Sequence, residues 1–276
     1  MEVRDAVHPE QARSFNTEEL RKHFLITGLF VPDTVKLVYS YYDRLIVGGI
    51  LPVKPQTLNV DKKIIGASYL LERREMGIIN VGAPGTVTVD GQSLQLNAHD
   101  GLYVGMGARE LLFSSLSPDQ PARFYLNCAP AHKTYPTTKM TINEAAPAHL
   151  GSPEKGNKRT IYKYIHPDGI RSCQLVMGMT HLEPCNLWNT MPVHTHQRRM
   201  EAYFYFNMGT EDLVFQFIGA PSETRHLIVH NEEAVLHPSW SIHSGVGTKH
   251  YSFIWGMAGE NQTFSDMDEV PMSDLR

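Results

Sequence analysis

Three histidines and one glutamate in the last third of the chain have the types and the spacing of metal ligands. His194 and His196 stand two residues apart, so on a β-strand, whose side chains alternate with a period of two, both imidazoles project from one face. Glu201 follows His196 at an odd separation, which would place it on the opposite face of an unbroken strand. With a turn between them, and with His243 from a distant strand, they make a set of imidazole and carboxylate ligands that suits Zn, Fe, Mn, Ni or Co.

The elements that must position these ligands are two strands and the turn between them. Residues 197–199 are polar enough for a turn, and the aromatic-rich run 202–207 predicts the next strand, which Glu201 would open. In that register Glu201, Tyr203 and Tyr205 share one face. We therefore expect the carboxylate to meet the histidine pair across an antiparallel hairpin.

An isolated His-x-His pair is more often two surface histidines on an edge strand. Here the pair belongs to a longer order, in which the glutamate follows and Pro238 later precedes His243. This order resembles the two-part signature of the cupin superfamily. The chain departs from that signature where Trp188 and Trp240 stand in place of glycines and where a glycine is displaced to Gly209, but no departure removes a ligand.

Composition excludes several classes of protein. The chain has 276 residues, 42% of them hydrophobic and 20% charged, and a net charge of -4, so it is globular and has no basic field for nucleic acid. Its cysteines, Cys128, Cys173 and Cys185, are scattered and odd in number, which argues for a reducing compartment. The N-terminus has no apolar signal region, and no later stretch is long enough to span a bilayer. We expect a cytoplasmic protein without nucleic-acid or membrane partners.

Short β-rich runs separated by glycine-containing turns predict an all-β protein with antiparallel strands. The dipeptides Asp90-Gly91 and Asp100-Gly101 are strong turn signals. Near the N-terminus, Asn16 or Thr17 offers a cap for a short helix that continues to Phe24. The expected strands cover residues 35–42, 44–47, 68–71, 77–81, 86–89 and 101–105 in the first half, and 160–165, 173–178, 213–218, 226–230 and 250–255 in the second.

The stretch 143–160 is rich in Pro, Gly, Ala and charge and is the best candidate for a linker. It predicts two cupin-like antiparallel β-sandwich or barrel domains in tandem, at 1–142 and 161–276, with short helices. Both halves carry an Arg-Arg pair beside a candidate hairpin, at Arg73-Arg74 and Arg198-Arg199, which hints at an internal repeat. Because the first half has no His-x-His pair, we expect its domain to be metal-free and the C-terminal domain to bind the metal.

A wider comparison rests on motifs at residues 43–49, 71–77, 86–91, 127–132, 189–196, 198–201, 239–248, 253–257 and 259–262. Over nearly the full length these resemble the bacterial 5-keto-4-deoxyuronate isomerases. The resemblance implies a zinc-dependent aldose-ketose isomerase of pectin and uronate degradation, with one Zn²⁺ per chain. It also implies a small keto-uronate as substrate and a homo-oligomer, commonly a hexamer, as the assembly. The family's zinc ligands map onto His194, His196, Glu201 and His243.

The implied reaction converts 5-dehydro-4-deoxy-D-glucuronate to 3-deoxy-D-glycero-2,5-hexodiulosonate, which makes the enzyme an intramolecular oxidoreductase. It moves either a proton, through an enediol and with a general base, or a hydride, and both routes stay open here. Tyr203 and Tyr205, on the strand face of Glu201, are candidate catalytic residues that would donate to an oxygen of the reacting centre. The substrate carboxylate calls for an arginine, and Arg199 or its neighbour Arg198 is nearest to the ligands in sequence.

Two other functions fit the same ligands. A cupin with three histidines and one glutamate can hold Fe(II) and act as a dioxygenase, which oxygen consumption would reveal. A non-catalytic sugar-binding cupin would bind uronates without turning them over.

Overall fold

The computed structural model describes residues 1–263 and 265–276, which form two compact units. Each unit is built mainly from antiparallel strands in a seven-stranded and a four-stranded sheet. The predicted all-β class is therefore confirmed, and among the described residues the sheets stay open and do not close into barrels. Unit 1 contains Met1–Arg4, Gly28–Ala146 and Lys163–Met177, and unit 2 contains Asp5–Thr27, Pro147–Tyr162 and Gly178–Arg276.

The sheets of unit 1 have the following strands in spatial order. The larger sheet contains β1 (Glu2–Arg4), β3 (Val35–Ser40), β4 (Ile46–Ile50), β11 (Phe124–Pro130), β6 (Arg74–Asn80), β9 (Gly101–Val104) and β12 (Thr138–Met140). The smaller sheet contains β5 (Gln56–Thr57), β10 (Leu111–Ser115), β7 (Gly85–Val89) and β8 (Gln92–Leu96).

Unit 2 repeats this architecture. Its larger sheet contains β13 (Ala148–Leu150), β14 (Arg159–Ile165), β15 (Val176–Leu182), β23 (Ser252–Gly259), β18 (Arg199–Phe206), β21 (Ala234–His237) and β2 (Leu25–Ile26). Its smaller sheet contains β16 (Trp188–Asn189), β22 (Ser244–Gly247), β19 (Val214–Ala220) and β20 (Glu223–Val229). A separate pair joins β17 (His194–Thr195) to β24 (Asp268–Glu269).

The helices are short. They are α1 (Pro9–Ala12), α2 (Thr17–Phe24), α3 (Lys62–Ile65) and the 3₁₀ turns η1 (Leu70–Glu72), η2 (Ile142–Glu144), η3 (Pro153–Lys155) and η4 (Met272–Asp274). None of the helices in the described part of the chain has the length and apolar character needed to cross a membrane.

An apolar core joins the two sheets of unit 1. Phe113 of the smaller sheet packs on Phe124 of the larger one, with ring centroids 5.4 Å apart, and both rings are fully buried. At the edge of the smaller sheet, β7 and β8 are joined by the two-residue turn Asp90-Gly91, whose φ angles are 46° and 85°. Positive φ at both turn residues matches the twist of the strands, as the Asp-Gly dipeptide predicts.

A buried carboxylate fastens one loop of unit 1 to its larger sheet. Glu75 on β6 is fully buried, and its two oxygens accept four hydrogen bonds. The Tyr103 hydroxyl donates at 2.8 Å, and the backbone N–H groups of Cys173, Gln174 and Leu175 donate at 2.7, 2.8 and 2.9 Å. The carboxylate therefore satisfies three backbone donors that would otherwise lose water without a partner.

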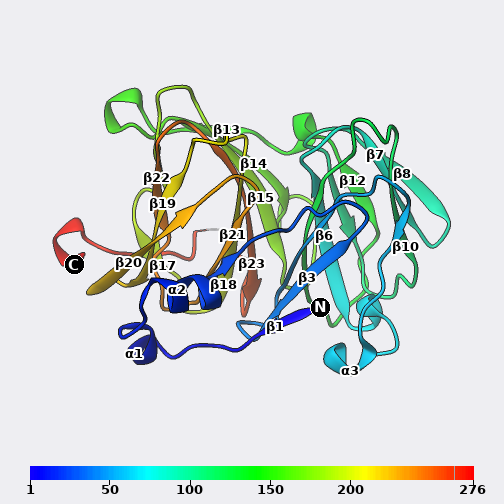
Figure 1. Cartoon of the computed structure of the whole chain (residues 1–276), viewed down its shortest axis with the longest axis horizontal. Coiled ribbons are helices and arrows are strands. Elements are labelled where there is room, and N and C mark those ends of the chain that lie inside the picture. The colour runs from blue at the N-terminus through cyan, green and yellow to red at the C-terminus, as the bar shows by residue number, and fades with distance from the viewer. Residues whose placement is uncertain (264) are drawn as a thin grey trace. The chain divides into compact units, whose positions relative to one another are not determined.

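Helix α2, which has 8 residues, belongs to unit 2 and begins where the sequence predicts. The Asn16 side chain accepts from the N–H of Glu19, and the Glu19 side chain accepts from the N–H of Asn16, which is a reciprocal capping box. Phe24, at the end of α2, is buried and meets the Trp240 ring edge-on at 6.3 Å. In Figure 1 the blue α1 and α2 accordingly lie at the lower edge of unit 2, with α2 beside its yellow strands.

Three predictions about local structure are wrong. The turn expected at Asp100-Gly101 lies instead at residues 97–100, where the Asp100 N–H donates to the Asn97 carbonyl, and Gly101 already opens β9. The segment 68–71, expected as a strand, turns into η1, because the Glu72 carboxylate accepts from the N–H of Ser68 at 2.6 Å and closes the chain on itself. The expected hairpin between the histidine pair and the glutamate strand is also absent from the described ladders. Instead β17 pairs with β24, and both edges of β18 are occupied by β21 and β23.

The two units interleave along the chain, since unit 2 takes the segment 5–27 as well as the C-terminal residues. The stretch 143–160 contains β13 and η3. The division into domains at 1–142 and 161–276 stays a prediction.

Candidate metal centre

Strand β18 carries four buried polar side chains on one face. Arg199, Glu201, Tyr203 and Tyr205 alternate with apolar residues along the strand, and each is at most 4% exposed. Because strand side chains alternate, all four point to the same side, as the sequence predicts for the last three. The strand is paired with β21 on one edge and with β23 on the other, which fixes the orientation of this face.

The two histidines of the His-x-His pair are oriented by backbone carbonyls. The Nδ1 atom of His194 lies 2.9 Å from the carbonyl oxygen of Pro192, and that of His196 lies 3.1 Å from the carbonyl oxygen of Arg199. A carbonyl only accepts, so each Nδ1 carries a proton, and in the neutral form of each ring Nε2 has the lone pair that a metal takes. The N–H of Arg199 donates back to the His196 carbonyl at 3.3 Å, which forms the turn expected between the ligands.

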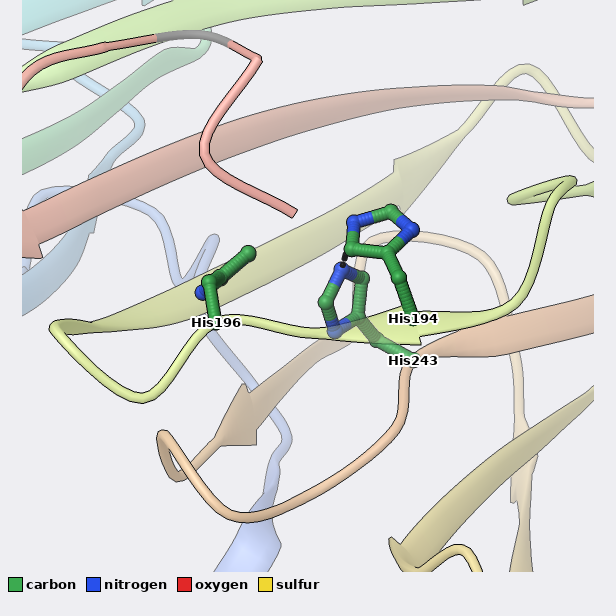
Figure 2. Close-up of side chains that lie close together, drawn as sticks. All are labelled: His194, His196 and His243. Carbon is green, nitrogen blue, oxygen red and sulfur yellow. Dashed lines mark hydrogen bonds between the residues drawn. The ribbon is translucent and has the colours of Figure 1, made fainter. Parts of the chain in front are cut away.

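His243 comes from another part of the chain, just before β22, and completes the group. Its Nε2 lies 3.0 Å from Nε2 of His194 and 3.1 Å from Oε2 of Glu201, and that oxygen lies 3.1 Å from Nε2 of His196. Figure 2 shows His194 and His196 on one segment and the His243 ring reaching them from a second segment. The sequence-predicted ligands thus converge on one point.

This buried group can hold a metal ion. The ligand atoms of the three histidines all lie within 4.8 Å of one another. Donors that share one ion at bond lengths of about 2.0–2.2 Å lie roughly 3 to 3.5 Å apart, which the contacts of Glu201 and His243 approach. Burial lowers the pKa of His194 and, more strongly, that of His243, so both imidazoles are neutral, as metal ligands must be.

A cavity of about 220 Å³ adjoins the ligands and is lined by residues of unit 2 alone. It is far larger than the ~10–15 Å³ that a single water needs on the same measure, so it accommodates a small molecule. Three of the four ligands, His194, His196 and Glu201, contribute to its wall. The rest of the wall is mainly apolar and includes Phe253 and Trp255 of β23.

The two tyrosines predicted as catalytic residues differ in their position relative to the cavity. Tyr203 lines the cavity, and its hydroxyl lies 2.7 Å from Oγ1 of Thr190, whereas the Tyr205 hydroxyl donates to Oε1 of Gln216. Tyr205 is not among the described residues that line the cavity. Burial raises the pKa of both phenols well above the usual range, so both stay protonated.

The two arginines beside the ligands also differ. Arg199 is buried and lines the cavity, and its guanidinium donates to Asn261 Oδ1 and the Thr263 carbonyl. Arg198 is instead engaged by the carboxylates of Asp266 and Asp268, at 2.6 and 2.9 Å. Arg199 is therefore the arginine of the pair that turns inward.

Sequence reasoning missed two polar residues of this interior. Arg159, the first residue of β14, lines the cavity, although the predicted strand began one residue later. His237 on β21 faces Glu201 across the ladder and is 1% exposed. The only available signal for His237 was an aliphatic run ending in a histidine, Ala-Val-Leu-His. This pattern is equally typical of a histidine packed in the hydrophobic core.

Burial lowers the pKa of His237 to about 3, with the nearby His196 as a smaller cause. The unfolded chain, with an ordinary value of 6.5, takes up this proton first as the pH falls. The stability that a neutral His237 contributes is therefore complete above pH 6.5 and is lost progressively towards pH 3.

Replacing His237 with glutamine should flatten this acid dependence. Urea unfolding of wild type and variant at pH 7, 6 and 5 should show that the free energy of unfolding falls less steeply in the variant, by up to about 1.4 kcal/mol per pH unit. The exposed His226→Gln is the matched control and should keep the wild-type slope. Parallel pH profiles for wild type and His237→Gln would contradict the assignment.

Solved structures share the fold. An IolB-like protein from Salmonella typhimurium LT2 superimposes with a TM-score of 0.72 at 12% identity and covers 90% of this chain and 96% of that chain. Oxalate decarboxylase from Lactobacillus farciminis, in its formate complex, gives a TM-score of 0.56 at 10% identity over 83% of this chain and 79% of that chain. These likenesses concern the fold alone and confirm its cupin-like character.

Closer relatives are found by sequence. The chain is 56% identical to the 4-deoxy-L-threo-5-hexosulose-uronate ketol-isomerase of Enterobacter sp. (strain 638) and 55% identical to that of Escherichia coli (strain K12 / DH10B), over the full length of both chains. The predicted enzyme class, a ketol-isomerase and hence an intramolecular oxidoreductase, is confirmed by these relatives. The model of the KduI/IolB family also matches residues 30–272, and the chain therefore belongs to that family.

Proposed function

We propose that this chain is a zinc-dependent ketol-isomerase of uronate and pectin degradation. Its substrate would be 5-dehydro-4-deoxy-D-glucuronate, which is another name for the compound in the names of its relatives, and its product 3-deoxy-D-glycero-2,5-hexodiulosonate. The observation that carries the proposal is the convergence of His194, His196, Glu201 and His243, of which the first three line a small-molecule cavity. Full-length relatives above half identity support the substrate.

The residues present fit a zinc ion, because imidazole nitrogens and carboxylate oxygens are its common donors. When bound, the ion would act as a Lewis acid that stabilises charge developing on the substrate oxygens. The chain's own residues orient the substrate and exclude water. Tyr203, protonated and on the ligand side of the cavity, is placed to donate a hydrogen bond to a substrate oxygen.

Metal analysis and an isomerase assay test the proposal directly. Protein purified without chelator should contain about one zinc per chain and should convert the keto-uronate. Iron in place of zinc, together with oxygen consumption, would favour the dioxygenase. Metal and uronate binding without turnover would favour the sugar-binding protein.

The two tyrosines offer a matched pair of variants. Tyr203→Phe should lower kcat by about 100-fold, the effect of losing one donor to the reacting centre, while the zinc content stays unchanged. Tyr205→Phe, which removes a hydroxyl bonded to Gln216, should leave kcat near the wild-type value. Steady-state kinetics on zinc-matched protein decides the assignment, and equal effects of the two substitutions would refute it.

We extend the proposal to the assembly and location of the enzyme. The resemblance to the uronate isomerases implies a homo-oligomer, commonly a hexamer. The sequence predicts that the enzyme acts in the cytoplasm and that its N-terminal domain binds no metal. Light scattering on the purified protein measures its mass in solution and decides the oligomer.

A further inference from the structure

A second arginine lines the cavity and has no carboxylate partner. Arg159 is 8% exposed and shares the cavity wall with His194 and Glu201. Its guanidinium donates to the backbone carbonyls of Asn157 at 2.9 Å and of Met191 at 3.2 Å. Within residues 1–263 and 265–276, no Asp or Glu oxygen lies within ion-pair distance of it.

Such an arrangement leaves both charge and donors uncompensated. A guanidinium has five N–H donors, and two carbonyls take only part of this capacity. The Nε atom of Arg159 is buried without any hydrogen-bond partner in the described chain. A buried cation is unfavourable unless it is paired and fully hydrogen-bonded, so an anionic group that entered the cavity would gain a favourable partner in Arg159.

The neighbouring Arg199 is in a different electrostatic position. Although Arg199 is also buried, it lies close to two carboxylates, those of Glu201 and Asp266, which both favour its charged form. Around Arg159 the corresponding groups are phenols, those of Tyr203 and Tyr251. Of the two cavity arginines, Arg159 is therefore the one whose charge is left for a ligand.

The position of Arg159 suits the far end of a short substrate. Its partner Met191 lies three residues before the ligand His194, and Tyr203, whose charge state influences Arg159, has its ring 5.5 Å from that of His243. The wall around it is apolar and contains Ile161 of its own strand. Low polarity strengthens a guanidinium-carboxylate contact, and the planar fork of arginine matches two carboxylate oxygens.

We propose that Arg159 binds the carboxylate of the substrate and so selects sugar acids over neutral sugars at this site. The inference rests on the proposed function, since it assigns one end of the keto-uronate to Arg159 and leaves the carbonyl end to the metal ligands. The acid-binding group then lies on β14, whereas the arginines nearest to the metal ligands in sequence are Arg198 and Arg199.

Arg159→Gln in the zinc-loaded enzyme tests this role. For the keto-uronate, kcat/KM should fall about 10- to 100-fold, mainly through KM, because one or more charge-assisted hydrogen bonds are lost. For the methyl ester of the same compound, kcat/KM of Arg159→Gln should be close to the value that the wild type has for that ester. Arg159→Lys, which keeps the charge but not the fork, should show an intermediate loss confined to the acid and serves if Arg159→Gln does not fold.

Ligand binding provides a readout that does not need turnover. D-Glucuronate should raise the melting temperature of the wild type more than D-glucose does, and Arg159→Gln should abolish this preference. The exposed Arg171→Gln is the control and should keep it.

The outcomes separate the two proposals. Equal losses for acid and ester, or a preference for glucuronate that survives in Arg159→Gln, would overturn the role of Arg159 while leaving the isomerase intact. A wild type that prefers glucuronate through Arg159 but does not isomerise the keto-uronate would instead overturn the proposed reaction.

Discussion

Replacing His196 with alanine should remove the bound metal and the isomerase activity together. His196 supplies one of four converging donors, and its Nε2 lies 3.1 Å from Oε2 of Glu201, so its loss opens the centre and leaves that carboxylate without this neighbour. The fall in kcat/KM should exceed the roughly 10- to 100-fold that follows the loss of an outer partner of a metal ligand. Metal analysis and steady-state kinetics on the same preparation measure both effects.

His226→Ala provides the control for this experiment, because His226 is an exposed histidine of β20. It should retain zinc and turnover. A His196→Ala protein that keeps one metal per chain and full activity would show that the four-residue centre is not the site of the reaction. Loss of activity with retained metal would instead indicate a positioning role for His196.

The second large effect is expected on stability, at Glu75 in unit 1. Glu75→Ala leaves the Tyr103 hydroxyl and the Leu175 N–H without an acceptor in a fully buried place, and the N–H groups of Cys173 and Gln174 without one in a half-buried place. Each unsatisfied buried donor costs on the order of 1–3 kcal/mol, so the free energy of unfolding should fall by about 3–5 kcal/mol after local relaxation. Chemical denaturation monitored by fluorescence and circular dichroism gives this difference.

Glu110→Ala is the matched control for Glu75→Ala, since Glu110 is exposed. An exposed substitution of this kind changes stability by less than about 0.5 kcal/mol. If both variants unfold at the same denaturant concentration, the buried carboxylate does not hold the loop that contains Cys173. Glu75→Gln should fall between wild type and Glu75→Ala, because an amide oxygen accepts only part of the four hydrogen bonds.

Local signals in the sequence predicted local structure well. The cap at Asn16 and the turn at Asp90-Gly91 depend only on residues within a few positions, and both occur as expected. The strand predicted at 68–71 is absent because the Ser68 N–H donates to the Glu72 carboxylate and closes a turn. The β-rich composition of the segment does not reveal this hydrogen bond. Strand β11 was missed because it is buried on both faces and so shows no alternation of polar and apolar residues.

The candidate site divides in the same way. The spacing of His194, His196 and Glu201 predicted their convergence around a turn, which is present, although the hairpin expected to bring them together is not. The pairing of β17 with β24, and the presence of Arg159 in the cavity wall, depend on segments distant in sequence. No local pattern encodes such contacts, and that the four converging donors bind zinc stays a prediction.

The repeat hinted at by the two Arg-Arg pairs has a structural counterpart. Arg74 opens β6 opposite Pro130, and Arg199 opens β18 opposite Gly259, each at the same end of its central ladder. Counted from these arginines, Met76 occupies the position that corresponds to Glu201. Met76 is fully buried in the apolar core of unit 1, so the equivalent interior there is filled by hydrocarbon.

The pairing of β2 with β21 has a consequence for biosynthesis. Leu25 leaves the ribosome early, but its partner Val235 emerges roughly two hundred residues later, after on the order of 10–40 s of translation. Throughout that interval the apolar side of α2, with Leu20 and Phe24, has no finished sheet to cover it. The nascent chain thus carries an exposed hydrophobic segment for most of its synthesis. Chaperones bind surfaces of this kind, and unprotected ones promote aggregation.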